Sequence, residues 1–250
     1  IGDGDEVITV SNTAVPTCTA IAMTGAKPVF VDIDEYSLID VSKIEDMISY
    51  QTKAILPVHL FGQMCDMDVI MDIAKRHNLK VIEDCAQSHG ATYKGRKCGS
   101  IGDVGCFSFY PTKIFGAYGD GGFITTNDEE LYDTMNRQRF FGMERKKMSS
   151  GHWNGKYYAI EHGPSYIYVV AHTDRDKILK DLADRDIHLN ISYPWPIHTM
   201  IGYEYLGWGE GDLPITERRA NEIFSLPMYP TLTDDEQTTV IQTLKELLGG

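Results

Sequence analysis

The stretch LKVIEDC, residues 79–85, runs from apolar, partly β-branched residues directly into a carboxylate. Three similar runs precede it at comparable spacing: EVITV at 6–10, KPVFVDI at 27–33 and KAILPVHL at 53–60. Short runs of this kind are typical of buried strands. Two segments between them, VSKIEDMISYQ at 41–51 and MDVIMDIAKRHN at 67–78, carry apolar residues at helical intervals. The alternation predicts an α/β fold with a mainly parallel central sheet and helices on both faces.

The composition is that of a globular chain without a membrane span. The chain has 250 residues, of which 42% are hydrophobic, so it can bury a sizeable core. No apolar run reaches about 18 residues, and the N-terminal sequence lacks the features of a signal peptide, so we expect a cytoplasmic protein. A net charge of −13 argues against a nucleic-acid partner. The five cysteines show no C-x-x-C spacing, which favours reduced thiols.

The periodic pattern lapses after the helical segment DEELYDTMNRQRFFG. We therefore divide the chain into a large α/β domain (1–142), a connection (143–164) and a small α+β C-terminal domain (165–250). The last domain should contain the strand SYIYVVAH, the helix DRDKILKDLADRDI and two closing helices at about 214–225 and 234–248. Thr233 and Glu236 form a capping-box pattern for the final helix.

A carboxylate and a lysine follow two of the predicted strands. Asp84 ends the strand KVIED, and Lys113 follows the aromatic strand GCFSFY, just before a glycine-rich stretch. Ligands of parallel sheets bind beyond the carboxyl ends of the strands, so neighbouring strands would place both groups in one crevice. Such a pair fits pyridoxal phosphate, whose aldehyde forms a Schiff base with a lysine and whose ring nitrogen a carboxylate keeps protonated. Burial among aromatic residues would lower the pKa of the lysine and free its amine.

Each of these features also has an ordinary structural interpretation. Lys113 alone could be a solvated turn residue, and Asp84 alone could cap a helix. The glycines of GDGG at 119–122 could cradle a phosphate, but a hairpin turn into the following strand is the more common use.

Two other kinds of site are not expected. A metal site could be imagined from His59, His89, Asp66 and Asp84, but their spacing matches no zinc pattern. An NAD-dependent oxidoreductase is disfavoured because no G-x-G-x-x-G follows the first strand.

Several motifs occur in the order of a known family. They are GDEVIT, TGAKPVFVDID, TKAILPVHLFGQ, DMDVIMDIAKRHNLKVIEDCAQSHGA, GDVGCFSFYPTK, YPWPIH, LPITERRANEIFSLPMYP and LTDDEQ. Together they resemble the DegT/DnrJ/EryC1/StrS family of pyridoxal-phosphate-dependent sugar aminotransferases over most of residues 4–248. Within the family, the chain looks most like the dTDP-3-amino-3,6-dideoxyhexose transaminases. The resemblance implies the type I aminotransferase fold and a homodimer with active sites at the subunit interface.

The resemblance also implies roles for single residues. Lys113 matches the lysine that binds the cofactor covalently and later moves protons, and Asp84 matches the partner of the pyridine nitrogen. Gln87 matches the glutamine near the ring hydroxyl, and Ser108 matches a serine that binds the cofactor phosphate. His198, in the Pro-rich loop YPWPIH, is our candidate for a substrate contact.

The family pattern is incomplete in places. Relatives begin upstream of GDEVI with a segment that binds the cofactor phosphate, so we expect a large domain without that N-terminal part. They also carry a motif like GYNSRLDELQAA where this chain has the short connection 143–164; Asn154 is not followed by that motif, so it does not inherit the role of the motif's asparagine. Ala14 stands where many relatives stack an aromatic residue on the cofactor, and Ser192 stands where a histidine often occurs.

The expected function is amino transfer in the biosynthesis of deoxyamino sugars, such as those of lipopolysaccharides or antibiotics. An amino acid, L-glutamate by analogy with the family, would be the donor, and a keto-deoxy sugar nucleotide, dTDP-3-keto-6-deoxyhexose, the acceptor. Family members that dehydrate their substrates replace the lysine with histidine, so Lys113 argues for transamination. The alternative is a truncated, non-catalytic relative that acts as a binding or regulatory module.

Overall fold

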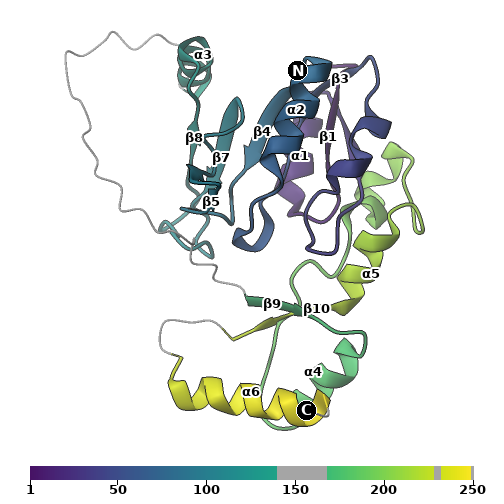
Figure 1. Ribbon diagram of the computed structural model, residues 1–250, viewed down its shortest axis with the longest axis vertical. Coiled ribbons are helices and arrows are strands. Elements are labelled where there is room, and N and C mark those ends of the chain that lie inside the picture. The colour runs from purple at the N-terminus through teal and green to yellow at the C-terminus, as the bar shows by residue number, and fades with distance from the viewer. Residues whose placement is uncertain (140–167, 228–231, 249–250) are drawn as a thin grey trace, which may run out of the picture.

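The computed structural model describes residues 1–139, 168–227 and 232–248. The predicted connection 143–164, with Asn154, lies outside these residues. Figure 1 shows a large α/β body above a small lobe, with the helix α5 (Pro214–Glu222) between them. None of the described helices is long and apolar enough to cross a bilayer.

A six-stranded sheet forms the centre of the large body. Its order is β2-β1-β3-β4-β7-β8. The strands are β1 (Glu6–Val10), β2 (Lys27–Val31), β3 (Thr52–Ile55), β4 (Lys80–Asp84), β7 (Val104–Ser108) and β8 (Gly122–Thr125). All neighbours pair in parallel except β8, which runs antiparallel to β7. The predicted mainly parallel sheet is confirmed.

The connections between the strands define where a ligand can bind. The chain crosses from β1 to β2 through α1 (Val15–Met23) and, in the opposite direction along the sheet, from β3 to β4 through α2 (Met67–His77). Since such crossovers are right-handed, the two helices cover opposite faces. The order reverses between β1 and β3, and the crevice outside the carboxyl ends of strands at such a reversal is the usual ligand site of an open α/β sheet.

Helix α2 has the ends that its sequence predicts. Asp66 accepts a hydrogen bond from the Val69 amide at the N-terminus, and Lys75, Arg76 and His77 occupy the last turn. Asn78 ends the helix in the left-handed region, with φ of 54°. These features agree with helix-capping chemistry and with the favourable placement of cations at the negative end of a helix.

The prediction of an α-helix over 41–51 is wrong. Two short 3₁₀ turns occupy this segment, η1 (Val41–Lys43) and η2 (Glu45–Met47). The residues of this segment that pack on the core are Val41, Ile44, Met47 and Ile48. The first three recur at the period of a 3₁₀-helix, and Val41, Ile44 and Ile48 also fit an α-helix, so the spacing alone did not distinguish the two.

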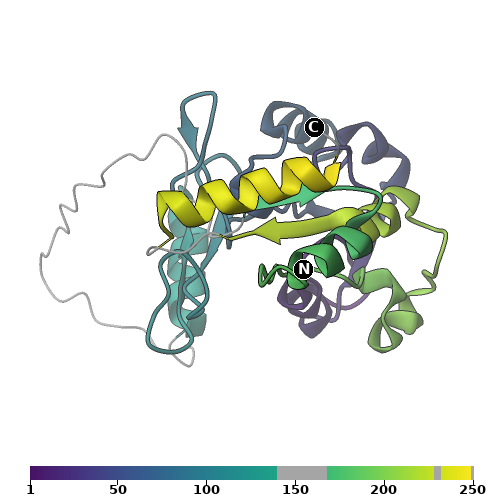
Figure 2. The ribbon, with the colours of Figure 1, turned by 90° about the horizontal axis from the view of Figure 1, so that it is seen from below.

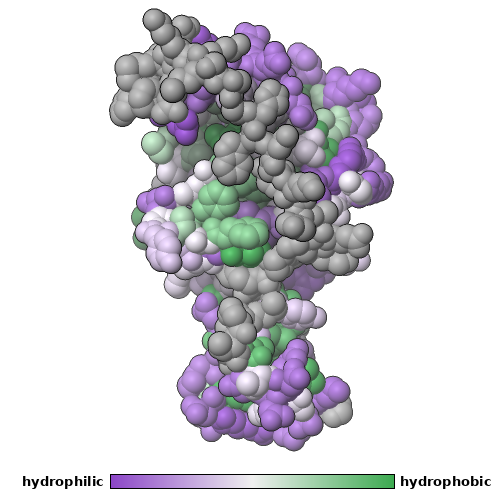
Figure 3. Space-filling model, turned by 90° about the vertical axis from the view of Figure 1, so that its left-hand side faces the viewer, coloured by the Kyte–Doolittle hydropathy of each residue, from purple (hydrophilic) through white to green (hydrophobic). Residues whose placement is uncertain are grey.

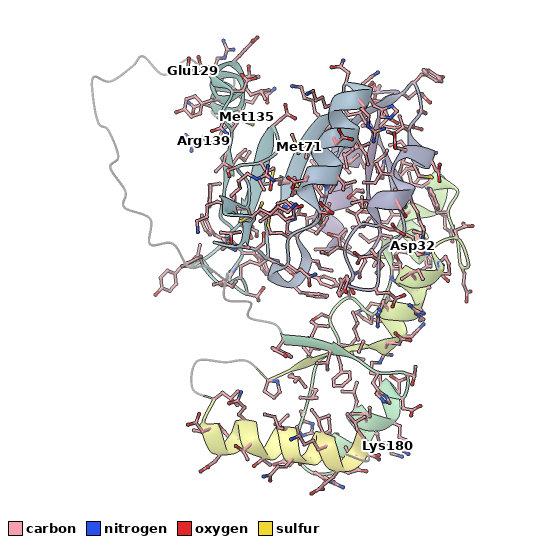
Figure 4. The ribbon with its side chains drawn as sticks, in the orientation of Figure 1. Asp32, Met71, Glu129, Met135, Arg139 and Lys180 are labelled. Carbon is pink, nitrogen blue, oxygen red and sulfur yellow. The ribbon has the colours of Figure 1, made fainter. Side chains whose placement is uncertain are left out.

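Shorter elements complete the large body. They are the turn η3 (Leu60–Gly62), the hairpin β5 (Thr92–Tyr93) and β6 (Arg96–Lys97), and the helix α3 (Glu129–Arg139). Figure 4 labels Glu129 and Arg139 at the two ends of α3, beside β8.

The small lobe consists of a two-stranded antiparallel ribbon and two helices. Strands β9 (Tyr168–Ala171) and β10 (Ile223–Leu226) pair, and Figure 2 shows α6 (Asp234–Leu248) lying across them near α4 (Arg175–Ala183). The predicted capping box is confirmed: the Thr233 amide donates to Glu236, and the Glu236 amide donates to the Thr233 hydroxyl. The helix predicted to reach 225 ends at Glu222, and the chain then enters β10.

Much of the C-terminal half packs on the large body. Ile197, Leu206 and Leu213 from the turns η4 (Ile197–Thr199) and η5 (Ile201–Leu206) and the residue before α5 form an apolar cluster with Cys18 and Phe30. The carboxylate of Asp32, directly after β2, accepts hydrogen bonds from the Ile215 amide at 3.0 Å and the Thr216 amide at 2.9 Å. Asp32 is only 5% exposed, and Figure 4 labels it beside this junction. An aspartate from β2 therefore caps a helix that begins more than 180 residues later.

We expect Asp32→Ala to lower the free energy of unfolding by about 1–3 kcal/mol, because it leaves the first amides of α5 without an acceptor. Urea titration monitored by circular dichroism measures this change. Asp46→Ala, at an exposed position, serves as the control and should change stability by less than about 0.5 kcal/mol. Equal effects of the two variants would contradict the capping role.

Candidate active site

Asp84 and the loop that carries Lys113 lie at the same edge of the sheet. Strands β4 and β7 are neighbours with Asp84 opposite Cys106, so the condition set by the sequence analysis is met. Lys113 lies in the hairpin connection between β7 and β8. This loop is closed by hydrogen bonds from the Phe109 amide to the Gly121 carbonyl at 2.7 Å and from the Ala117 amide to the Phe109 carbonyl at 2.8 Å. Strands β7 and β8 form an antiparallel hairpin, but its connection is residues 109–121, longer than the predicted turn at 119–122, and Gly122 already belongs to β8.

The lysine loop needs a glycine three residues after Lys113. A Cβ atom on Gly116 would lie 2.3 Å from the carbonyl oxygen of Pro111, which is backbone and cannot move aside. The close approach of these two segments turns the chain back within a few residues. It keeps Lys113, whose amide donates to the Tyr110 carbonyl at 2.8 Å, near the end of β7.

Burial and the charge of Asp84 act on the Lys113 amine in opposite directions. The Lys113 side chain is half-buried, and burial lowers the pKa of its amine, while the negative charge of Asp84 opposes that shift. Burial disfavours an ammonium ion, and a carboxylate favours it only at short range. The amine therefore lies within electrostatic reach of the carboxylate and loses its proton more readily than a solvated lysine.

The carboxylate of Asp84 is held in place by hydrogen bonds to both of its oxygens. Oδ2 accepts from the hydroxyl of Thr17 at 2.8 Å, and Oδ1 accepts from the Ala86 amide at 3.0 Å. The backbone of Asp84 bonds on both sides to the segment that follows β3, through the Pro57 carbonyl and the His59 amide. The position of this anion is thus set by three parts of the chain.

Gln87 links the exit of β3 to the C-terminal half. Its Oε1 accepts from the Phe61 amide at 2.9 Å, and its Nε2 hydrogen-bonds to the hydroxyl of Tyr193. Phe61 and Tyr193 both have left-handed backbones, with φ of 58° and 57°, and their rings lie 6.2 Å apart. Such conformations cost about 1–3 kcal/mol each and occur mainly at functional sites. The amide nitrogen of Gln87 carries a second hydrogen that another acceptor could use.

Ser108 ends β7, and its hydroxyl accepts from the Tyr110 amide at 3.2 Å. The two flanking phenylalanines point to the other face, as the strand alternation predicts: the ring of Phe123 lies 4.2 Å from that of Phe107 and 5.3 Å from that of Phe109. The buried ring of His89 packs against both, with centroid distances of 5.6 and 5.8 Å.

His198, the candidate substrate contact, is 1% exposed. Its Nδ1 lies 2.8 Å from the Ser11 hydroxyl and its Nε2 lies 2.9 Å from the Glu217 carboxylate. The Ser11 hydroxyl also accepts from the His198 amide at 3.0 Å. With both ring nitrogens used and no exposed edge, this geometry indicates a tether between the end of β1 and the C-terminal half. It places no ring nitrogen toward a ligand.

Beside Asp84, the carboxylate of Glu83 is completely buried. It accepts four hydrogen bonds, from His59 Nε2 at 3.0 Å and from the amides of Gly99, Ile101 and Gly102 at 2.9, 2.8 and 2.7 Å. Burial alone would raise its pKa, but these donors hold the pKa below the usual glutamate value. Since His59 Nδ1 accepts from the Cys65 amide, the ring proton is on Nε2 and the imidazole is neutral.

The described residues contain one group with metal-ligand geometry, His59, Glu83 and Cys85, whose candidate ligand atoms lie within 4.8 Å of one another. It is not the set imagined from the sequence. Both nitrogens of His59 are already hydrogen-bonded, to Glu83 and to the Cys65 amide, so we interpret this cluster as a structural hydrogen-bond network.

A cavity of about 480 Å³ opens next to this edge of the sheet. The loops after β2 and β3 line it on one side, with Tyr36, Phe61 and Gln63, and Tyr168 and Arg219 line it on the other. Its size is typical of small-molecule sites. Phe61 belongs to both the cavity and the Gln87 contact, so the cavity adjoins the group around Asp84.

The sequence matches the profile of the DegT/DnrJ/EryC1/StrS aminotransferase family over residues 1–162 and 159–245. The chain belongs to this family. It is 44% identical to a dTDP-3-amino-3,4,6-trideoxy-alpha-D-glucose transaminase of Micromonospora megalomicea subsp. nigra, over all of this chain and 80% of that protein. It is 39% identical to a dTDP-3-amino-3,6-dideoxy-alpha-D-galactopyranose transaminase of Aneurinibacillus thermoaerophilus, over 98% of this chain and 79% of that protein.

Solved structures agree. The S. venezuelae DesV enzyme in complex with a ketimine intermediate superposes with a TM-score of 0.87 at 31% identity, over 99% of this chain and 79% of that one. The predicted type I aminotransferase fold is confirmed, and the protein is an aminotransferase whose cofactor is pyridoxal phosphate. The donor set around Asp84 fits this group, because a fixed carboxylate and a partly desolvated amine are the two functions that the pyridine nitrogen and the aldehyde require.

Sequence reasoning missed three residues of this site. Glu83 was seen only as part of a strand, although a charged residue inside an apolar run signals a buried partner. Thr17 and Tyr193 meet Asp84 and Gln87 from 67 and 106 residues away. No local pattern reports contacts of that range.

The pH dependence of Lys113 reactivity tests its environment. Only the neutral amine reacts, so labelling by trace acetic anhydride should reach half of its maximum below the ordinary lysine value of 10.5. In Asp84→Asn the midpoint should move lower still, because the charge that raises the pKa is gone. Peptide mass spectrometry of cofactor-free protein gives the profile, with exposed Lys75 as internal reference. A midpoint at or above 10.5 would contradict the half-buried placement.

Glu83→Gln should lower the free energy of unfolding by about 3 kcal/mol, because an amide cannot accept on both sides and leaves buried donors unpaired. Glu45→Gln is the matched control: Glu45 pairs with Arg76 and His77 on the surface, so its loss should cost less than about 1 kcal/mol. Denaturant titration of both variants decides. If Glu83→Gln lowers the free energy of unfolding no more than Glu45→Gln does, the stabilising role of the Glu83 hydrogen bonds is contradicted.

Proposed function

We propose that this aminotransferase moves an amino group from an amino acid to the ketone of a nucleotide-linked deoxy sugar, with L-glutamate as donor and dTDP-3-keto-6-deoxyhexose as acceptor. The observation that carries the proposal is the half-buried Lys113 amine within electrostatic reach of the fixed Asp84 carboxylate. The names of the relatives from M. megalomicea and A. thermoaerophilus support the choice of a dTDP-linked 3-amino sugar.

Each residue of the site receives one role in this proposal. Asp84 holds the proton on the pyridine nitrogen, and Gln87 donates its second Nε2 hydrogen to the ring hydroxyl. Ser108 donates to the phosphate, since its hydroxyl hydrogen is not used by the Tyr110 amide. Lys113 would hold the cofactor through its amine, and the same amine would serve as the base that moves a proton during amino transfer.

The bound cofactor supplies an electron sink that stabilises the negative charge left when that proton is removed. The chain's own contribution is to lower the pKa of the Lys113 amine by burial and to hold the amine close to the reacting carbon. We expect the sugar nucleotide to extend into the cavity lined by Tyr36, Phe61 and Tyr168, because the Phe61 amide connects that cavity to Gln87. Its one arginine, Arg219, is already paired with Glu35 and Glu222, so aromatic and neutral polar contacts would dominate there.

We also propose a homodimer and a cytoplasmic location. The edge strand β8 and the lysine loop leave apolar side chains exposed, namely Tyr110, Phe115, Phe123 and Ile124. Figure 3 faces this side and shows apolar residues gathered there. A patch of this kind beside a site is a common subunit interface. The five cysteines are free, which suits a reducing compartment.

The first test is spectroscopic. The purified protein should be yellow after incubation with pyridoxal phosphate, and borohydride should fix the cofactor to the peptide that contains Lys113. In Lys113→Ala the cofactor should bind without covalent attachment, and turnover should fall by on the order of 10³-fold or more. Lys94→Ala, at a surface ion pair, is the control and should keep full activity. A protein that stays colourless would favour the non-catalytic alternative.

The second test concerns the substrate. Conversion of L-glutamate to its 2-oxo acid should depend on a dTDP-linked 3-keto-6-deoxy sugar, with parallel lines in double-reciprocal plots, as ping-pong kinetics require. The corresponding 4-keto sugar and the UDP-linked analogue are the competitors. Faster turnover of either one would overturn the proposed acceptor and leave amino transfer intact.

A further inference from the structure

Two threonines form a chain of hydrogen bonds that ends at the carboxylate of Asp84. Thr17, in the first turn of α1, donates from Oγ1 to Oδ2 of Asp84 at 2.8 Å. Thr13, just before that helix, places its own Oγ1 2.9 Å from the Oγ1 of Thr17. The two threonines are 7% and 5% exposed, so water competes little for these hydrogen bonds.

The direction of this chain of hydrogen bonds follows from the chemistry of the acceptor. An ionised carboxylate only accepts, so the hydroxyl hydrogen of Thr17 is committed to Asp84. The hydrogen between the two threonines must then come from Thr13. A threonine in a helix often donates its hydroxyl hydrogen back to a carbonyl one turn earlier, but here that hydrogen goes to Asp84, and the hydrogen bond from Thr13 helps to fix the orientation of the Thr17 hydroxyl. Hydrogen bonds in series also strengthen one another.

The N-terminus of helix α1 also favours a negative charge at the position of Asp84. Its N-cap residue, Ala14, has no side chain that could accept a hydrogen bond, and its first turn contains no acidic residue. The carboxylate that reaches this turn comes from β4 instead, through the contact with Thr17. The positive end of the helix dipole favours a negative charge there. Since each oxygen of Asp84 accepts only one described hydrogen bond, each keeps a lone pair for a further donor.

We propose that Thr17, oriented by Thr13, is a positioning residue that holds the carboxylate of Asp84 aimed at the cofactor's ring nitrogen. This inference rests on the role of Asp84 in the proposed function. It assigns to Thr17 a share in cofactor affinity that depends on the charge of Asp84, and not a contact with the cofactor.

Three thiols and one amine lie near the carboxylate of Asp84. The thiols facing it are Cys18 on α1, Cys85 after β4 and Cys106 on β7; burial raises the pKa of each, to about 12 for Cys18 and about 11 for Cys106. They stay neutral through the acidic and neutral range. The remaining charged neighbour is Lys113 from the lysine loop.

The test measures the dissociation constant of pyridoxal phosphate for the full chain, freed of cofactor. Thr17→Val, which keeps the shape and removes the hydroxyl, should weaken binding by about tenfold or more. Thr17→Ser should restore affinity to within about threefold, and Thr13→Val should weaken it by a smaller factor. Thr19→Val, which removes a hydroxyl of the same helix that bonds to Tyr203, is the control and should bind normally.

Asp84→Asn separates this inference from the function on which it rests. If Thr17 acts through the carboxylate, Thr17→Val should have no further effect in an Asp84→Asn background. Binding that is sensitive to Asp84→Asn but unchanged in Thr17→Val overturns the inference alone, as does a full Thr17→Val effect in the double variant. Binding that is insensitive to Asp84→Asn overturns the assigned role of Asp84, and the inference falls with it. Thermal unfolding of each variant shows whether a loss of affinity reflects a loss of fold.

Discussion

The buried carboxylate of Glu83 connects three neighbouring strands of the central sheet through hydrogen bonds. Glu83 is fully enclosed and binds the imidazole of His59, which follows β3, as well as three amides of the segment that leads into β7. Glu83 thereby connects β4 to the segment that follows β3 and to the segment that precedes β7. Parallel strands are not joined by hairpins that would fix their relative positions. In this sheet the Glu83 carboxylate, with its four hydrogen-bond donors, fixes them instead. The next residue, Asp84, receives its position from this arrangement.

The sequence allowed correct predictions wherever the deciding interaction was local. Strand alternation placed Ser108 opposite Phe107 and Phe109, the cations at the end of α2 marked its last turn, and the threonine–glutamate pair before α6 formed the expected cap. The prediction failed over 41–51, because the apolar spacing of so short a segment fits both a 3₁₀-helix and an α-helix, and the chain forms 3₁₀ turns there. The resemblance to a family supplied candidate roles that periodicity alone could not.

Long-range contacts were beyond the reach of such reasoning. His198 was expected to face a ligand because it follows a Pro-rich loop, but Ser11 and Glu217 enclose both of its nitrogens. Asp32 looked like the end of a strand, and it caps α5. The predicted small domain contains residues that pack with Cys18 and Phe30 of the large body. A polar side chain gives no sign, within its own neighbourhood, of the distant segment that will satisfy it.

The hairpin that carries Lys113 differs from the rest of the sheet in how its ends meet. Strands β7 and β8 are consecutive in sequence and joined by residues 109–121, whereas Asp84 depends on a contact with Thr17, 67 residues away. Local pairings close quickly and distant ones close slowly, since loop-closure entropy grows with separation. During folding, the nucleophile's turn can therefore form well before its acidic partner is in place. The capacity to capture a carbonyl compound and the capacity to use it as a catalyst would then be acquired at separate moments in the life of a newly made chain.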